Sequence, residues 1–263
     1  MSDLEWRAER LLVIGMVHLA PLPGTPLYRA DSLDQTITVA VESACALEAG
    51  GADGCLIQTV DRLYGVSDDA DPARTCAATL ISQAVRGATG PDFAIGIQIM
   101  RNAVRASLAV AHLCGGSFVR AAVLVGATVS AHGIVTADPL TVMEYRRKIG
   151  AERVQVIADV DSMHFRWLGG GREAGEVAHA ARGVGASAVA VGHPAPETTL
   201  EMVRSVREHA PGLPVVLAGY TNHDNAARLT AAVDGVFVGG CLEDSDGRVD
   251  EQAVSRYIEI VRA

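Results

Sequence analysis

The sequence predicts an α/β fold, a single eight-stranded (β/α)₈ TIM barrel spanning residues 1–263. The length lies close to the roughly 250 residues typical of such a barrel. Short apolar runs alternate with helical patterns along the chain, which indicates successive parallel β/α units. Only 4% of the residues are aromatic, whereas alanine, valine and glycine abound. That composition favours closely packed parallel strands and helices over an antiparallel sandwich.

Each predicted strand is an apolar run, and each predicted helix carries apolar residues at helical spacing. Several strands follow a glycine that would cap the preceding helix, as Gly50 and Gly51 do before Asp53. The predicted strands are residues 11–18, 53–59, 93–100, 117–124, 153–159, 187–191, 215–218 and 235–238. The predicted helices are residues 33–48, 71–86, 102–113, 139–149, 172–184, 197–209, 222–231 and 251–261.

Charge and cysteine usage narrow the class of protein. The formal net charge is −9 and no basic stripe appears, which argues against a nucleic-acid partner. The five cysteines are widely spaced, without a C-x-x-C pair, as expected for a reduced cytoplasmic protein. The longest early apolar run, residues 11–17, is too short to span a membrane. We therefore expect a soluble cytoplasmic protein without a membrane span.

Glycines end the last two predicted strands. The strand at 215–218 stops at Gly219, and Asn222 follows as a candidate helix N-cap. Backbone N–H groups at such glycines bind phosphate in many barrels, in the loops after strands seven and eight. The alternative is that the glycines only make tight turns. The predicted phosphate-binding residues are Gly192, Gly219, Thr221, Gly239 and Gly240.

Polar side chains at the carboxyl ends of the other strands are candidates for the chemistry, because active sites of this fold lie there. His18 ends the first strand and suits a base, an acid or a ligand, or else it bonds a neighbouring loop carbonyl. The second and third strands contribute Gln58 and Gln98, and Arg101 and Asn102 follow at the rim.

Arg120 lies within the apolar fourth strand, where a guanidinium needs a carboxylate or an anionic ligand. Asp159, at the end of the neighbouring strand, is the expected partner. The pair is either a structural ion pair or part of a substrate contact.

Asp161 and His164 follow Asp159 and suit general acid/base work, or a divalent cation together with His18 or His193. Their spacing matches no zinc signature, so we expect no metal and no cofactor. Residues 125–138 form a small-residue loop long enough to fold over the mouth as a lid, or to serve as an interface.

Several stretches, taken together and in order, resemble the BtpA/SgcQ family. The first is the most specific, since a strand ending in histidine before Leu-x-Pro-Leu-Pro-Gly is unusual. The stretches are IGMVHLAPLPG at 14–24, IQIMRN at 97–102, FVRAAVLVGA at 118–127, MEYRRKIGA at 143–151, IADVDSMH at 157–164, LAGYTNHDN at 217–225 and DGVFVGG at 234–240. The resemblance implies a (β/α)₈ barrel grouped with ribulose-phosphate-binding barrels. The family positions that it carries over are His18, Pro21, Pro23, Gly24, Arg101, Asn102, Arg120, Asp159 and His164.

The chain departs from the family pattern at several of these motifs. Acidic and lysine side chains are lost together, which implies either an altered substrate or binding without turnover. The departures are Gln58-Thr59 for Glu-Asn, Ala103 for Asp after Arg-Asn, Arg120-Ala121-Ala122 for Arg-Val-Asn, Met163-His164 for Lys-His, and Gly239-Gly240 for Gly-Ser.

Two functional hypotheses follow. The first is an enzyme that isomerises, cleaves or hydrolyses a small phosphorylated metabolite, a sugar phosphate or a nucleotide-like compound, with His18, Asp159 and His164 handling protons and Arg101 or Arg120 neutralising charge. A Schiff base is less attractive, because Lys148 is the only lysine and lies in a predicted helix.

The second hypothesis is a non-catalytic assembly or regulatory factor, as some family members are linked to photosystem I accumulation. Alanine- and valine-rich outer helices predict a homo-oligomer, although packing on the barrel explains the same pattern.

Overall fold

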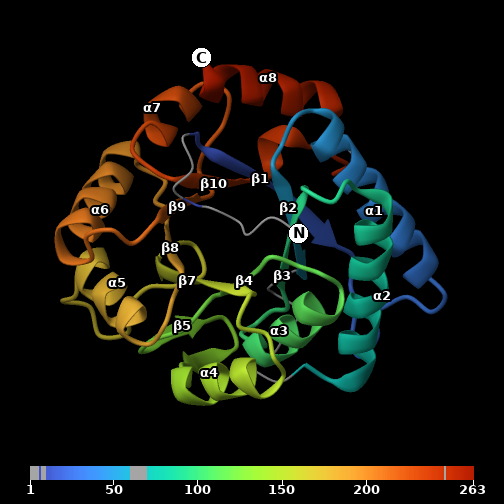
Figure 1. Cartoon of the computed structure of the whole chain (residues 1–263), viewed down its shortest axis with the longest axis horizontal. Coiled ribbons are helices and arrows are strands. Elements are labelled where there is room, and N and C mark those ends of the chain that lie inside the picture. Colours follow the sequence, from blue (N-terminus) through green and yellow to red (C-terminus); the bar gives the residue numbers. More distant parts are fainter. Residues whose placement is uncertain (1–5, 7–9, 60–69, 246) are drawn as a thin grey trace.

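The computed structural model describes residue 6 and residues 10–59, 70–245 and 247–263. Eight parallel strands close into a barrel in the order β1-β10-β9-β8-β7-β4-β3-β2, and the helices surround it (Figure 1). The barrel strands are β1 (Leu12–Leu19), β2 (Gly54–Thr59), β3 (Ala94–Gln98), β4 (Phe118–Ala121), β7 (Gln155–Asp161), β8 (Ala188–Val191), β9 (Val215–Ala218) and β10 (Gly235–Val238). The predicted (β/α)₈ barrel is confirmed.

The helices lie where the periodicity of the sequence predicts them, with one clear exception. They are α1 (Leu33–Ala49), α2 (Pro72–Ala88), α3 (Val104–Leu113), α4 (Pro139–Lys148), α5 (Ala174–Gly183), α6 (Pro196–His209), α7 (Ala226–Thr230) and α8 (Glu251–Arg262), with a short 3₁₀ turn, η2 (Gly240–Leu242). Helix α7 is much shorter than predicted. Asn222 does not cap it: the Asn222 side chain accepts from the amides of Asp224 and Asn225 and holds a turn, so Asn225 takes the cap position.

The segment after β4 is more ordered than the predicted loop. It forms an antiparallel hairpin of β5 (Ala127–Ser130) and β6 (Gly133–Thr136). The amide of Arg166 donates to Thr128 Oγ1, and the amide of Leu168 donates to the carbonyl of Ala127, so the hairpin packs on the loop after β7. Its pairing was missed because glycine and small residues here lack the apolar alternation by which strands are recognised.

The interior of the barrel is apolar toward the amino ends of the strands. Trp6 closes this end and meets the rings of Phe118 and Phe237 edge-on, at centroid distances of 5.7 and 6.2 Å. We call this cluster the barrel floor. Its buried members are Trp6, Leu12, Ile14, Met16, Leu56, Ala94, Phe118, Ile157, Ala188, Ala190, Val216, Ala218 and Phe237. Because strand side chains alternate, the next inward positions toward the carboxyl ends form the mouth.

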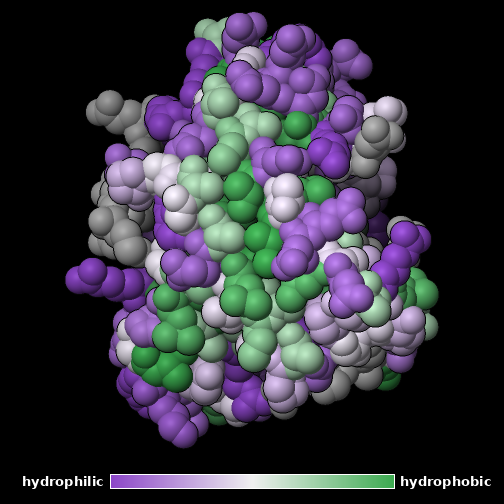
Figure 2. Space-filling model, turned by 90° about the vertical axis from the view of Figure 1, so that its right-hand side faces the viewer, coloured by the Kyte–Doolittle hydropathy of each residue, from purple (hydrophilic) through white to green (hydrophobic). Residues whose placement is uncertain are grey.

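Apolar side chains form a band across the side of the molecule where α1 and α2 lie (Figure 2). Leu33, Ile37 and Val41 of α1 are only partly buried, and Leu80 of α2 is largely exposed. None of the described helices is long and apolar enough to cross a membrane. The predicted homo-oligomer stays a prediction.

Candidate functional site

A cavity of about 220 Å³ opens at the carboxyl ends of the strands. It brings together residues from the first, second, fourth and last two barrel strands and from the loop after β7. Its lining residues are Met16, His18, Gln58, Arg120, Met163, His164, Ala218, Gly219, Tyr220, Thr221, Phe237, Val238, Gly239 and Gly240. Many of the site residues predicted from the sequence therefore share one cavity.

His18 is held at the edge of this cavity by a residue that sequence reasoning missed. Its Nδ1 lies 3.1 Å from Oε1 of Glu243, which follows η2. The ring also lies against Gly239, where an added Cβ would come within 3.3 Å of His18 Cε1. A carboxylate that accepts from Nδ1 fixes the tautomer, so that Nε2 is the nitrogen able to take up a proton.

The glycines that line the cavity differ in what they contact. A Cβ on Gly240 would meet no atom within 4 Å, so packing gives no reason for glycine there. The backbone of Gly219 has a φ of +80°, which favours glycine whatever the ligand. Gly192 lies outside the lining: its N–H donates to the Asp161 carbonyl at 2.8 Å, and an added Cβ would clash with the Ala218 carbonyl. Gly240 is thus the lining glycine at which a side chain would meet only open space.

Helix α8 supports the loop after β9. Thr221 Oγ1 and the Tyr257 hydroxyl are 2.8 Å apart, and both side chains are buried. The ring of His223 meets Tyr257 edge-on, while its Nε2 lies 2.9 Å from the Ala253 carbonyl. Burial raises the pKa of Tyr257 far above its ordinary value, so the phenol stays protonated and serves as a support. Sequence reasoning also missed Tyr257.

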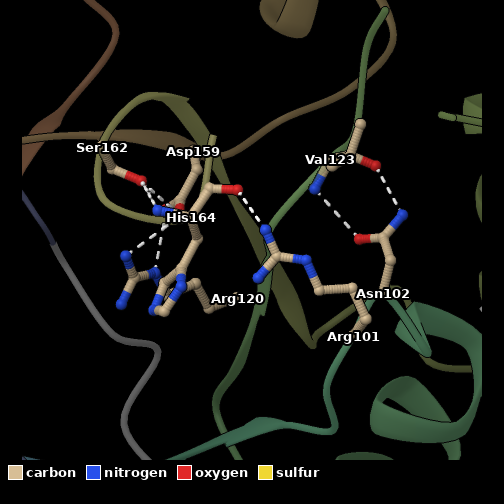
Figure 3. A network of polar contacts seen from close by, with 7 residues as sticks. All are labelled: Arg101, Asn102, Arg120, Val123, Asp159, Ser162 and His164. Atoms are coloured by element: carbon tan, nitrogen blue, oxygen red, sulfur yellow. Dashed lines mark hydrogen bonds and ion pairs between the residues drawn. The ribbon is translucent and has the colours of Figure 1, made fainter. Parts of the chain in front are cut away.

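Arg120 and Asp159 form the ion pair expected from their neighbouring strands, and that prediction is confirmed (Figure 3). Arg120 donates from Nε and Nη2 to the two oxygens of Asp159 at 2.9 and 3.0 Å. The Ser162 hydroxyl adds a third bond to Asp159, at 2.8 Å. Asp159 is fully buried and does not line the cavity, whereas Arg120 does. Asp159 therefore orients the Arg120 side chain from behind the cavity wall.

The same network fixes the loop that carries His164. The His164 amide donates to Ser162 Oγ, and Arg101 Nη2 donates to the His164 carbonyl at 2.8 Å (Figure 3). Arg101 and His164 also line a second cavity, of about 300 Å³, beside the hairpin residue Thr128. His164 therefore borders both cavities, whereas Arg101 lines only the second.

Asn102 is held in place on both sides. Its Nδ2 donates to the Val123 carbonyl and its Oδ1 accepts from the Val123 amide, at 2.9 and 3.0 Å (Figure 3). Both ends of the carboxamide are thus used to tie the loop after β3 to the end of β4. Although we predicted Asn102 as a pocket residue, these contacts give it a structural task.

Gln58 and Gln98 extend the polar layer from His18 across three adjacent strands. The register pairs His18 with Gln58, and Gln58 with Gln98. Both glutamines are at least 95% buried. Oε1 of Gln58 and both polar atoms of the Gln98 carboxamide find no hydrogen-bond partner in the described part of the chain.

Asp161 and His193 lie outside the main cavity lining. Burial raises the pKa of the Asp161 carboxyl, and the nearby charges of Arg166 and His193 only partly oppose that rise. His193 Nδ1 accepts from the Ala195 amide at 3.0 Å, so it shapes the turn into α6.

Burial raises the pKa of Cys241, which lies in η2, to about 11, so the thiol is protonated at neutral pH. Within residues 10–59, 70–245 and 247–263, no group of three or more His, Cys, Asp or Glu side chains is placed to hold a metal ion.

Solved structures share this architecture at low sequence identity. Thiamine phosphate pyrophosphorylase from Pyrococcus furiosus superposes with a TM-score of 0.59 at 18% identity, covering 98% of both chains. Phosphoribosyl anthranilate isomerase from Thermus thermophilus gives a TM-score of 0.56 at 13% identity, covering 96% of this chain and 98% of the isomerase. At these identities the likeness shows the fold.

Relatives are similar over nearly the whole sequence. The photosystem I biogenesis protein BtpA of Synechocystis sp. is 31% identical over 255 residues, which cover 94% of this chain and 86% of that protein. An uncharacterized protein of Archaeoglobus fulgidus is also 31% identical, over 95% of this chain and 98% of its own. The BtpA family model matches residues 9–263. With motifs, barrel and family match in agreement, the chain belongs to the BtpA family.

Proposed function

We propose that this protein is an enzyme that binds a small phosphorylated metabolite at the barrel mouth and transfers a proton on it with His18. The observation that carries the proposal is the shared cavity, in which the open backbone of Gly240 lies on the same wall as the His18–Glu243 pair. Backbone N–H groups after the last two strands of a barrel are suited to a phosphate group.

The other groups at the mouth divide the work. His18 Nε2 exchanges the proton, because Glu243 fixes the opposite nitrogen and stabilises the imidazolium. His164, which lines the same cavity, is the second proton-transfer candidate. Arg120 stabilises negative charge that develops on the ligand, although Asp159 already neutralises part of its own. This scheme suits isomerisation, carbon–carbon cleavage or hydrolysis. A Schiff base is not part of this scheme, because Lys148, the only lysine in the sequence, is exposed at the end of α4 and does not line the cavity.

The names of the structural neighbours support a phosphorylated ligand without identifying it. One is a thiamine phosphate pyrophosphorylase and another a phosphoribosyl anthranilate isomerase. Both share the fold of this chain, in which the loops after the last two strands form the glycine-lined wall described above.

A substitution at Gly240 tests the phosphate site directly. Thermal unfolding with inorganic phosphate, phosphorylated sugars and nucleotides should show a raised midpoint for the unmodified chain, because a ligand that binds only the native state stabilises it. Gly240→Ala should fold normally, as nothing opposes its Cβ, yet lose most of that rise. Gly87→Ala is the matched control, because a Cβ at Gly87 also meets no atom within 4 Å and this residue lies in α2. The alanine should stabilise the helix by up to about 1 kcal/mol. It should leave the response of the unfolding midpoint to phosphate unchanged.

A non-catalytic assembly factor is the second candidate. The apolar band along α1 and α2 and the name of the Synechocystis relative favour it. A folded chain whose midpoint responds to none of the phosphorylated compounds would favour this candidate over the enzyme.

A further inference from the structure

Buried polar atoms of Gln58, which lines the main cavity, and of its neighbour Gln98 find no partner among the described residues. An unpartnered buried polar group lowers stability, and such groups are rare in folded proteins. Here two of them occupy paired positions on adjacent strands, and Gln58 lines the main cavity. Three of their polar atoms find no acceptor or donor within the described ranges.

Their position in the barrel is close to the predicted phosphate site. Gly240 follows β10, and going round the barrel only β1 separates β10 from β2, while β1 and β2 separate it from β3. A ligand with its phosphate at Gly240 therefore reaches Gln58 by extending past β1 toward β2 and β3. On the way it passes His18 of β1, which adjoins Gln58 in the register.

Charge indicates that this far end is neutral. The carboxamides carry no charge, and Arg120, which follows the partner of Ile97 in the register, is already bonded to both oxygens of Asp159. The carboxylate of Glu243, 3.1 Å from the cavity residue His18, also disfavours a second anionic group near His18. A hydroxyl group, in contrast, can both donate to and accept from a carboxamide, and a carbonyl oxygen can accept from its NH₂ group.

Size limits the ligand further. The cavity holds about 220 Å³. Sites for drug-sized ligands typically hold roughly 300–1,000 Å³. The cavity by itself therefore suits a phosphate with a short carbon chain or a single small ring. A cavity of about 550 Å³ that shares His18 adjoins it, as does the second cavity, which shares His164.

We infer that Gln58 and Gln98 recognise the uncharged, hydroxyl-bearing end of a small sugar phosphate, whose phosphate lies at Gly240 on the far side of His18. The inference rests on the proposed function and narrows it, since it names a sugar phosphate as the ligand and the two residues that recognise it. The two glutamines set specificity, and His18 lies between them and the phosphate.

Calorimetric titration of the full chain with four probes tests the inference. The probes are inorganic phosphate, ribose 5-phosphate, 3-phosphoglycerate and uridine monophosphate. Ribose 5-phosphate should bind roughly tenfold more tightly than inorganic phosphate, as expected for two additional hydrogen bonds. The other two organic phosphates should bind no more tightly than inorganic phosphate.

Gln98→Met keeps the size of the side chain and removes its polar atoms. It should abolish the advantage of ribose 5-phosphate, leave the affinity for inorganic phosphate unchanged and raise the unfolding midpoint of the free protein. Gln155→Met is the matched control. Gln155 is the first residue of β7 and lies at the end of the barrel away from the mouth, so this substitution should alter neither affinity. If Gln98→Met folds poorly, Gln58→Met takes its place.

The outcomes separate this inference from the proposed function. Phosphate binding without an advantage for ribose 5-phosphate, or an advantage that survives in both glutamine variants, overturns the inference alone. Tighter binding of uridine monophosphate or 3-phosphoglycerate does the same. Failure of all four probes to bind overturns the proposed function, and the inference falls with it.

Discussion

The floor and the mouth of the barrel are built by the same strands, two residues apart. Phe118 and Arg120 are successive inward positions of β4, and Leu56 and Gln58 are successive inward positions of β2. The lower member of each pair packs in an apolar cluster, while the upper one belongs to the polar mouth. A step of one strand repeat thus separates residues that stabilise the barrel from residues able to act on a ligand.

The two regions meet where the floor residues Met16, Ala218 and Phe237 also line the cavity. The Arg120 guanidinium carbon lies 5.2 Å from the centre of the Phe237 ring, and that ring belongs to the floor. Below it, Trp6 closes the barrel. The following substitutions ask whether the regions act separately.

Asp159→Asn should have the largest effect on stability. It leaves the Arg120 charge buried without its carboxylate, and breaking a buried ion pair typically costs about 3–5 kcal/mol. Urea denaturation measures the loss. The double variant Arg120→Met with Asp159→Leu should be less destabilised than the single one, since it removes both charges. A single variant as stable as the unmodified chain would contradict the orienting role of Asp159.

Trp6→Ala should destabilise the floor by about 3 kcal/mol, as expected for loss of a buried aromatic ring. It should leave the response to inorganic phosphate unchanged, in contrast to Gly240→Ala. Thermal unfolding with and without phosphate measures both quantities. Equal loss of phosphate binding in the two variants would show that the floor and the mouth are coupled through Phe237.

Tyr257→Phe should cost about 1–3 kcal/mol, because it leaves the buried Thr221 hydroxyl without its 2.8 Å partner. Adding Thr221→Val should restore part of the loss, and the double-mutant cycle gives the coupling. If the two substitutions simply add, α8 does not support the loop after β9 through this bond.

Much of the mouth was predictable, because inward positions and strand ends follow from strand alternation. That reasoning located His18, Gln58 and Arg120 at one cavity, together with the glycines after the last two strands. It missed Glu243, whose contact with His18 joins residues 225 positions apart and depends on barrel closure. It also could not show that the Asn102 carboxamide makes two hydrogen bonds with the Val123 backbone.

Asp161→Asn should have the smallest effect, and its sign depends on pH. Burial raises the pKa of the native carboxyl above its unfolded value of about 3.9, so the native state holds the proton more tightly. That contribution to stability is full below the unfolded pKa and is lost as the pH rises through the native one. The neutral amide avoids the loss, so the variant should gain stability at pH 7 and differ little at pH 3.5. Urea denaturation at both pH values measures the difference. A gain that persists unchanged at pH 3.5 would mean that Asp161 acts on stability through packing and not through its ionisation.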